Sequence, residues 1–176
     1  MKLPSSPRTA TEDMERKDEK KHKHLTRLSH VWIENPIYMI NICVDNRKKV
    51  LANDMCHKIL RDEWYSALEI HGWQIGHYVV MPDHVHFFAS PGVKAKSFSE
   101  FIGKWKEWTS KRILKSLHCL KSDSNHLWQK EFFDYLIRSN DKYYEKCMYI
   151  YNNPLRAGLI NENEKWPYCG HIHFPE

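Results

Sequence analysis

The stretch from His77 to Pro91, HYVVMPDHVHFFASP, places two histidines one residue apart within an otherwise apolar run. Successive side chains of a β-strand point to opposite faces, so His84 and His86 are expected on one face, about 7 Å apart along the chain. Two imidazoles in that position can share one metal ion, because histidine is the commonest metal-ligating side chain, but histidines also pack as structural residues. The spacing alone leaves both interpretations open.

Two further pairs with the same spacing show that the pattern is not specific. The chain has 12 histidines among its 176 residues, so a His-x-His spacing arises readily by chance. His22/His24 lie in a lysine run and His171/His173 lie near the C-terminus, surroundings that predict exposed polar histidines. The middle pair, by contrast, falls in a segment that is typical of a buried strand.

Length and composition predict one folded domain with a sizeable core. Hydrophobic residues make up 41% of the chain, and the formal net charge of +5 suits a polyanionic partner. There is no apolar run long enough for a membrane span and no signal-peptide core, so no membrane partner is expected. The five cysteines show neither disulfide nor zinc-site spacing, which is typical of a cytoplasmic protein.

Apolar periodicity divides the chain into a polar arm and an α+β domain. Residues 1–30 are polar and charged, so we expect a flexible basic N-terminal arm, followed by a single domain over residues 31–176. Asn53 is the expected N-cap of the first helix, and Ser97 or Ser99 that of the second. The order β, α, β, β, α, β, α predicts a ferredoxin-like antiparallel sheet with helices on one face. Strands are predicted over 36–44, 73–81, 84–90 and 132–138, and helices over 53–70, 97–117 and 140–153.

The last predicted helix carries four tyrosines in DKYYEKCMYIYNNP, residues 141–154. At about 100° per residue, one stripe of this helix, expected in the core, consists of Tyr144, Cys147, Met148 and Tyr151. Tyr149 falls about 140° from that stripe, and Asn153 follows it by four residues on the same face, about 6 Å away. Tyr149 is either an ordinary half-exposed tyrosine or a functional hydroxyl. Asn153 is either a helix cap before a proline or a functional amide.

The helix predicted over 97–117 mixes basic and aromatic side chains. Such a surface suits single-stranded DNA, because the cations bind the backbone and the rings stack on bases. The alternative is that the tryptophans belong to the core and the lysines to a solvated face. Arg138 is likewise either a phosphate contact or an ordinary surface arginine. The candidate DNA-binding residues of the helix are Lys104, Trp105, Lys106, Trp108, Lys111, Arg112 and Lys115.

Three blocks together make the chain resemble a known family. VVMPDHVHFFAS, LWQKEFFDYLIRS and YIYNNPLRAGLI occur in the order and spacing of the single-tyrosine HUH transposases, and more narrowly of the REP-associated tyrosine transposases. In that family a His-hydrophobic-His pair follows an MP(D/E) turn, a WQ segment ending in IR comes next, and the nucleophilic tyrosine begins YIxxNP. The resemblance covers about residues 30–170. It implies the HUH endonuclease fold, a ferredoxin- or RRM-like antiparallel sheet with helices packed on it.

Carried over residue by residue, the resemblance implies that His84 and His86 are metal ligands, Tyr149 is the nucleophile and Asn153 is the third ligand. Relatives among insertion-sequence transposases have glutamine at the position of Asn153. Two imidazoles and one amide oxygen suit Mg²⁺ or Mn²⁺. The implied activity is cleavage and rejoining of single-stranded DNA beside a hairpin through a 5′-phosphotyrosine, by a monomer or a homodimer. Arg138 matches a family position.

Two other functions remain open on the sequence. A ferredoxin-like sheet also serves as a non-catalytic or domesticated nucleic-acid-binding module, although the Gly and aromatic pattern of RNA-binding sheets is missing here. A metal-dependent hydrolase that activates water is the third possibility, and it would form no covalent protein–DNA adduct.

Overall fold

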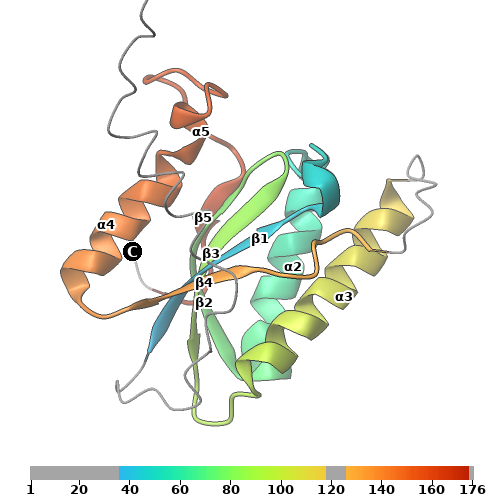
Figure 1. Ribbon diagram of the computed structural model, residues 1–176, viewed down its shortest axis with the longest axis vertical. Helices are drawn as coiled ribbons and strands as arrows, with labels where there is room; N and C mark the ends of the chain where they lie inside the picture. The colour runs from blue at the N-terminus through green and yellow to red at the C-terminus, as the bar shows by residue number, and fades with distance from the viewer. Residues whose placement is uncertain (1–35, 118–125, 175–176) are drawn as a thin grey trace, which may run out of the picture. The chain divides into compact units, whose positions relative to one another are not determined.

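A five-stranded sheet organises the chain in the computed structural model, which describes residues 36–117 and 126–174 (Figure 1). The predicted arm over residues 1–30, with His22 and His24, lies outside the described residues. No helix within the described ranges is long and apolar enough to cross a membrane. The elements are β1 (Ile37–Cys43), η1 (Asp45–Arg47), α2 (Asp54–His71), β2 (Trp73–Val80), β3 (His84–Pro91), α3 (Phe98–Ser116), β4 (Phe133–Ile137), α4 (Asn140–Tyr151), α5 (Asn153–Arg156) and β5 (Cys169–His171).

The four predicted strands are all present, in the antiparallel order β4-β1-β3-β2-β5. The fifth strand was not predicted, because it has only three residues. It places His171 opposite His77 on β2, with ring centroids 5.7 Å apart. His173 Nδ1 accepts a hydrogen bond from the backbone N–H of Ile75 at 2.9 Å. The prediction that His171 and His173 are simply exposed was therefore wrong, since this segment pairs with the edge of β2.

The predicted helix ends are set by local capping. The Asn53 side chain accepts a hydrogen bond from the backbone N–H of Cys56 at 2.9 Å, which confirms Asn53 as the N-cap of α2. Gly72 ends the same helix in the left-handed region, at φ +74°. Of the two candidate caps for α3, Ser97 is the one whose side chain accepts from the backbone of Glu100.

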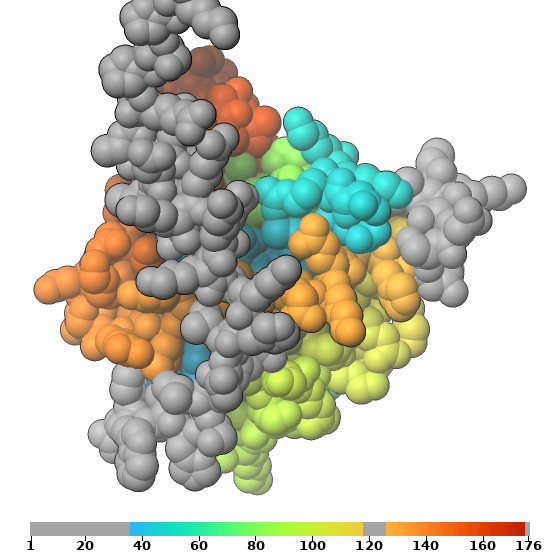
Figure 2. All heavy atoms as spheres, in the orientation of Figure 1, coloured from blue at the N-terminus to red at the C-terminus, as the bar shows by residue number. Residues whose placement is uncertain are grey.

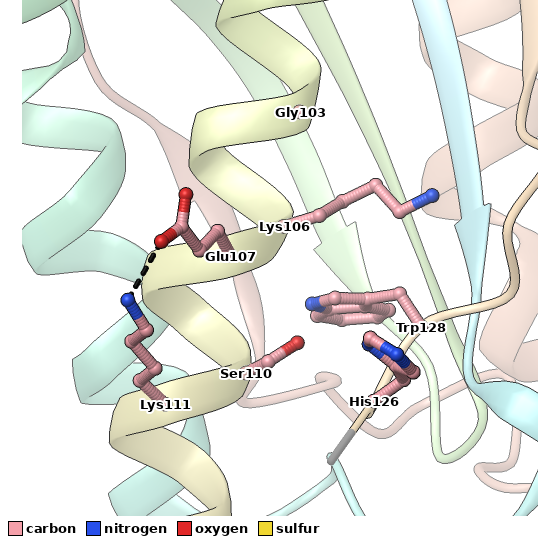
Figure 3. A pocket seen from close by; sticks show the side chains of 7 residues that line it. All are labelled: Gly103, Lys106, Glu107, Ser110, Lys111, His126 and Trp128. Atoms are coloured by element: carbon pink, nitrogen blue, oxygen red, sulfur yellow. Dashed lines mark hydrogen bonds and ion pairs between the residues drawn. The ribbon is translucent and has the colours of Figure 1, made fainter. Parts of the chain in front are cut away.

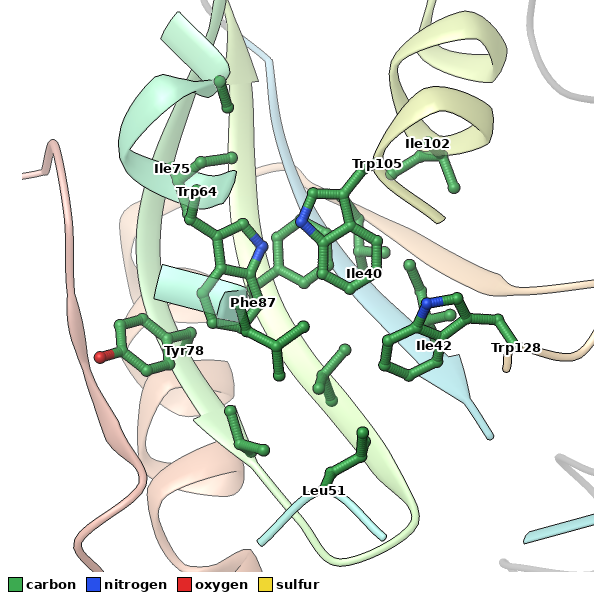
Figure 4. Close-up of a cluster of buried hydrophobic side chains, with 14 of the residues drawn as sticks. Ile40, Ile42, Leu51, Trp64, Ile75, Tyr78, Phe87, Ile102, Trp105 and Trp128 are labelled. Carbon is green, nitrogen blue, oxygen red and sulfur yellow. The ribbon is translucent and has the colours of Figure 1, made fainter. Parts of the chain in front are cut away.

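Helices cover both faces of the sheet, so the expectation of helices on one face was wrong (Figure 1). On one face, α2 and α3 contribute Trp64 and Trp105, whose rings stack with centroids 5.8 Å apart above Phe87 of β3 (Figure 4). On the other face, Cys147 and Ile150 of α4 pack with Phe88 of β3. The strands read as nearly continuous apolar runs, and such runs require cover on both sides.

We expect opposite effects from adding one methyl group at two glycines. Gly72→Ala forces a positive φ on alanine and brings its Cβ within 2.7 Å of the Ala95 Cα, so the free energy of unfolding should fall by about 2 kcal/mol or more. Gly103 lies in α3 with no atom within 4 Å of an added Cβ. Gly103→Ala should therefore raise the free energy of unfolding by up to about 1 kcal/mol. Urea titration of both variants measures the difference. Equal effects of the two changes would contradict this description of the α2–β2 turn.

Candidate active site

His84 and His86 lie side by side on the face of β3 that α4 covers. Their ring centroids are 4.9 Å apart, and the two rings are nearly perpendicular. The intervening Val85 is fully buried in the core beneath α2 and α3, as expected from the period of two along a strand. The predicted same-face placement of the two imidazoles is therefore confirmed.

Asp83 orients the His84 ring. The Asp83 Oδ1 atom lies 2.6 Å from His84 Nδ1, and Asp83 Oδ2 lies 2.9 Å from Arg47 Nε. With Nδ1–H donating to the carboxylate, the lone pair of Nε2 is left for another ligand, which is how carboxylates commonly position metal-binding histidines. Neither Asp83 nor Arg47 is among the site residues predicted from the sequence. The signal available was the acidic residue directly before His84.

Arg47 reaches Asp83 from an unusual backbone conformation. Asn46 and Arg47 both have positive φ, at 52° and 53°, a region that costs non-glycine residues about 1 kcal/mol or more each. The turn is held by a hydrogen bond from the backbone N–H of Asp45 to the carbonyl of Leu127 at 2.8 Å. Figure 2 shows this turn on the surface, beside the segment that begins at residue 126.

Burial keeps both imidazoles neutral. It lowers the pKa of His86 to about 3, and the proximity of His84 contributes to that shift. Burial also lowers the pKa of His84, against the opposing effect of its hydrogen bond to Asp83. Each ring therefore offers an unprotonated nitrogen at neutral pH, which metal coordination requires.

Tyr149 lies over His86. The two ring centroids are 6.1 Å apart with the planes at 80°, and 39% of Tyr149 is exposed. The helix that carries it is capped at its N-terminus by Ser139, whose side chain accepts from the backbone N–H of Lys142. From there α4 runs back along the sheet and brings Tyr149 above the histidine pair.

The buried side of α4 differs from the predicted stripe. Tyr144 is 68% and Met148 is 60% exposed, so the prediction that they belong to the core was wrong. The buried residues are Cys147 and Ile150. Tyr151 is half-buried, and its hydroxyl lies 2.8 Å from His77 Nδ1 and donates to the carbonyl of Gly170. Spacing alone misplaced the stripe, because apolar side chains occur all round this helix.

Asn153 is not the cap of α4, because Asn152 occupies that position. Asn152 keeps helical backbone angles, so Asn153 stays about one turn beyond Tyr149, as predicted. The Asn153 Nδ2 and His86 Nδ1 atoms are both buried without a hydrogen-bond partner. Nitrogens of Trp64, Trp105 and His71 in other parts of the core are also unpaired, so the lack of a partner does not by itself identify a ligand site.

The side chains present fit a divalent ion only when an amide is included. Among the residues that the structure describes, no group of three His, Cys, Asp or Glu side chains is arranged to hold a metal. His84, His86 and the Asn153 amide would supply two imidazole nitrogens and one oxygen, a donor set suited to Mg²⁺ or Mn²⁺ with positions left for substrate oxygens. The unpaired Nδ1 of His86 agrees with that donor set, whereas the unpaired atom of Asn153 is its amide nitrogen, which does not bind a metal ion.

Trp105 and four of the basic candidates for DNA binding on α3 are engaged in other contacts. Trp105 is 2% exposed within the core and cannot stack on a base, so that assignment was wrong. Trp108, at 51% exposed, is the accessible tryptophan of α3. The remaining pairs are Lys104 and Lys111 with Glu107, Lys106 with the carbonyls of Gln129 and Lys130, and Arg112 with Asp62 and Glu63.

Two further features lie away from the histidine pair. Arg138 follows β4 at the end of the sheet where Ile37 pairs with Ile137, whereas His84 pairs with Cys43 at the other end of β1.

A cavity of about 370 Å³ opens between α3 and the segment of His126 and Trp128 (Figure 3). Since α3 covers the face opposite to α4, this cavity is separate from the site of Tyr149.

Comparisons with known proteins show the family and the fold of the chain. A family model described as "Transposase IS200 like" matches residues 33–153. The REP-associated tyrosine transposase of Escherichia coli strain K12 is 23% identical over 142 residues, which cover 78% of this chain and 77% of that protein. A solved structure of a REP-associated tyrosine transposase bound to a REP hairpin is 22% identical, with a TM-score of 0.63 and 82% coverage of each chain. The solved structure shares the fold.

The low pKa of His86 predicts a pH-dependent stability. An unfolded histidine binds a proton below about pH 6.5, whereas the pKa of folded His86 is about 3. The unfolded state therefore binds more protons between these values, so stability should fall as the pH drops through that window, by up to about 1.4 kcal/mol per pH unit. Urea titrations in EDTA of wild type and His86→Gln measure this contribution. Parallel stability curves for the two proteins would contradict it.

Proposed function

We propose, on the premise that the chain belongs to the IS200-like transposase family, that it cleaves and rejoins single-stranded DNA beside a hairpin through Tyr149. The contact between the Tyr149 and His86 rings at 6.1 Å supports this most directly. It brings a partly exposed hydroxyl-bearing side chain from α4 to the pair of neutral imidazoles on β3. A nucleophile beside metal-ligand candidates is the arrangement that phosphoryl transfer to a side chain requires.

The proposed reaction is a transesterification. The phenolic oxygen of Tyr149 attacks the phosphorus of one phosphodiester, the bond from phosphorus to the 3′ oxygen breaks, and a 5′-phosphotyrosine forms. The phenol loses one proton, and the departing 3′ oxygen gains one as a free hydroxyl. Because one phosphodiester replaces another, the same hydroxyl or that of a second strand can reverse the step and rejoin the DNA without an external energy source.

The residues around Tyr149 have separate tasks in this proposal. When bound by His84, His86 and Asn153, a divalent ion supplies Lewis-acid polarisation of the scissile phosphate. Asp83 holds the His84 ring in the tautomer that leaves Nε2 unprotonated. The edge-on contact with His86 fixes the direction of the Tyr149 ring.

Hairpin-flanked single-stranded DNA is the proposed substrate. A flexible single strand can bend its backbone to a tyrosine that is fixed on a helix, whereas a duplex holds its phosphates more rigidly. The formal net charge of +5 suits a nucleic-acid partner. The solved relative bound to a REP hairpin supports a hairpin as the recognised element.

Replacing Tyr149 tests the nucleophile. Wild type incubated with a labelled hairpin-flanked strand and Mn²⁺ should form an adduct that survives denaturing electrophoresis, and Tyr149→Phe should form none, since only the attacking oxygen is removed. Tyr151→Phe is the matched control on the same helix. It should keep the adduct and lose only about 1 kcal/mol of stability with its hydrogen bonds.

Two outcomes of that experiment would contradict the proposal. Strand cleavage by wild type without any covalent adduct would indicate a hydrolase, and binding without cleavage would indicate a non-catalytic module. An adduct in Tyr149→Phe that is absent from Tyr151→Phe would place the nucleophile on the other tyrosine.

The metal assignment is tested through His84, His86 and Asn153. His84→Ala and His86→Ala should abolish adduct formation while hairpin binding is retained. Asn153→Ala should slow adduct formation by about 10- to 100-fold, the usual scale for altered metal coordination, and excess Mn²⁺ should restore part of the rate. Electron paramagnetic resonance of Mn²⁺ should show weaker binding by all three variants. Undiminished Mn²⁺ affinity in the histidine variants would contradict the assignment.

A further inference from the structure

Two cationic side chains lie against the ring of Tyr149. The Arg156 Cζ atom is 4.9 Å and the Lys146 Nζ atom is 5.6 Å from the centroid of that ring. Lys146 Nζ also lies 5.1 Å from the ring centroid of Tyr135 on β4. Neither cation is among the site residues predicted from the sequence.

The positions of both cations follow from the backbone on either side of Tyr149. Lys146 lies one helical turn earlier on α4, where a side chain three residues away reaches its neighbour. Arg156 is the last residue of α5, whose backbone N–H donates to the carbonyl of Asn152 at 2.9 Å. Buried Pro154 anchors that short helix. The turn after α4 therefore brings an arginine back to the tyrosine.

Placing two cations beside one ring has an electrostatic cost. An exposed cation–π contact is only weakly attractive, and two like charges beside one ring repel each other. Glu145 compensates incompletely, because its nearest oxygen is 3.7 Å from Lys146 Nζ and it also pairs with Lys142. An anion that arrives at the tyrosine hydroxyl would relieve the repulsion of both cations.

We propose that Arg156 and Lys146 bind a non-bridging oxygen of the scissile phosphate and hold the phosphodiester of the Tyr149–DNA intermediate. This rests on the proposed function and adds the residues that neutralise the phosphate. Negative charge grows on the non-bridging oxygens as Tyr149 attacks, and a guanidinium fork matches two phosphate oxygens. The same side chains hold the ring in place before the DNA arrives. Neither cation changes its own bonds in the reaction.

The test compares two substrates that differ at one oxygen. One is the labelled hairpin-flanked strand, and the other carries a methylphosphonate at the scissile position, in which a methyl group replaces one charged non-bridging oxygen. Rates of adduct formation are measured for wild type, Arg156→Ala, Arg156→Lys and Lys146→Ala. Arg61→Ala is the matched control, because Arg61 lies 5.7 Å from the ring of Tyr65 on α2, away from the site.

On the ordinary phosphate, Arg156→Ala should slow adduct formation on the order of 100-fold, as loss of a transition-state donor does. Arg156→Lys should recover part of that loss, because the charge remains but the fork does not. Lys146→Ala should have a smaller effect in the same direction, and Arg61→Ala none. On the methylphosphonate diastereomer that lacks the contacted oxygen, wild type and Arg156→Ala should react at nearly equal rates.

A purely structural role predicts a different result. If Arg156 only supports the fold, Arg156→Ala slows both substrates by the same factor, and that outcome would overturn the inference. Unchanged rates on the ordinary phosphate would overturn it as well. Both outcomes leave the wild-type adduct, and hence the proposed function, intact. Absence of any adduct from wild type with the ordinary phosphate would instead contradict the proposed function and this inference together.

Discussion

Alternate side chains of β3 project to two faces of the sheet that are both covered, and the histidine pair depends on that alternation. Val85 and Phe87 are fully buried beneath α2 and α3, while His84 and His86 project beneath α4. A slip of one residue would exchange the two sets and place both imidazoles in an apolar core, where neither has a partner. The register is held by pairing with β1 on one side and β2 on the other. The apolar residues therefore fix the position of the polar ones.

Packing of α4 determines how close the tyrosine comes to the histidines. Cys147 and Ile150 share a buried cluster with Phe88, two residues along β3 from His86. Tyr149 lies between these two helix positions in sequence, but 39% of it is exposed and it is not part of that cluster. The distance between nucleophile and imidazole thus depends on the volume of side chains that take no part in the chemistry. Asp83, held by Arg47, orients the His84 ring at the start of β3.

The sequence was sufficient to predict those features of the fold and the site that depend on local interactions. Asn53 and Gly72 bound α2 through contacts within one helical turn, and the period of two placed His84 and His86 on one face. Features that depend on distant residues were not predictable in this way. The buried side of α4 is selected by the sheet it meets, the pairing of Arg112 with Asp62 joins two helices, and β5 exists because β2 leaves an edge to pair with. The family resemblance, and not periodicity, singled out Tyr149.

The ion pairs on α3 bear on where a nucleic acid would gain most from binding. A phosphate that approaches Lys104 or Lys111 has to compete with Glu107, whose pKa is lowered to about 2 by its hydrogen bonds to those two ammonium groups. Part of the free energy from neutralising a phosphate is then offset by breaking an existing pair. Arg156 and Lys146, by contrast, lie against the ring of Tyr149 itself. A phosphate that reaches the tyrosine and the histidine pair therefore meets these two cations, whereas the cations of α3 lie on the opposite face of the sheet.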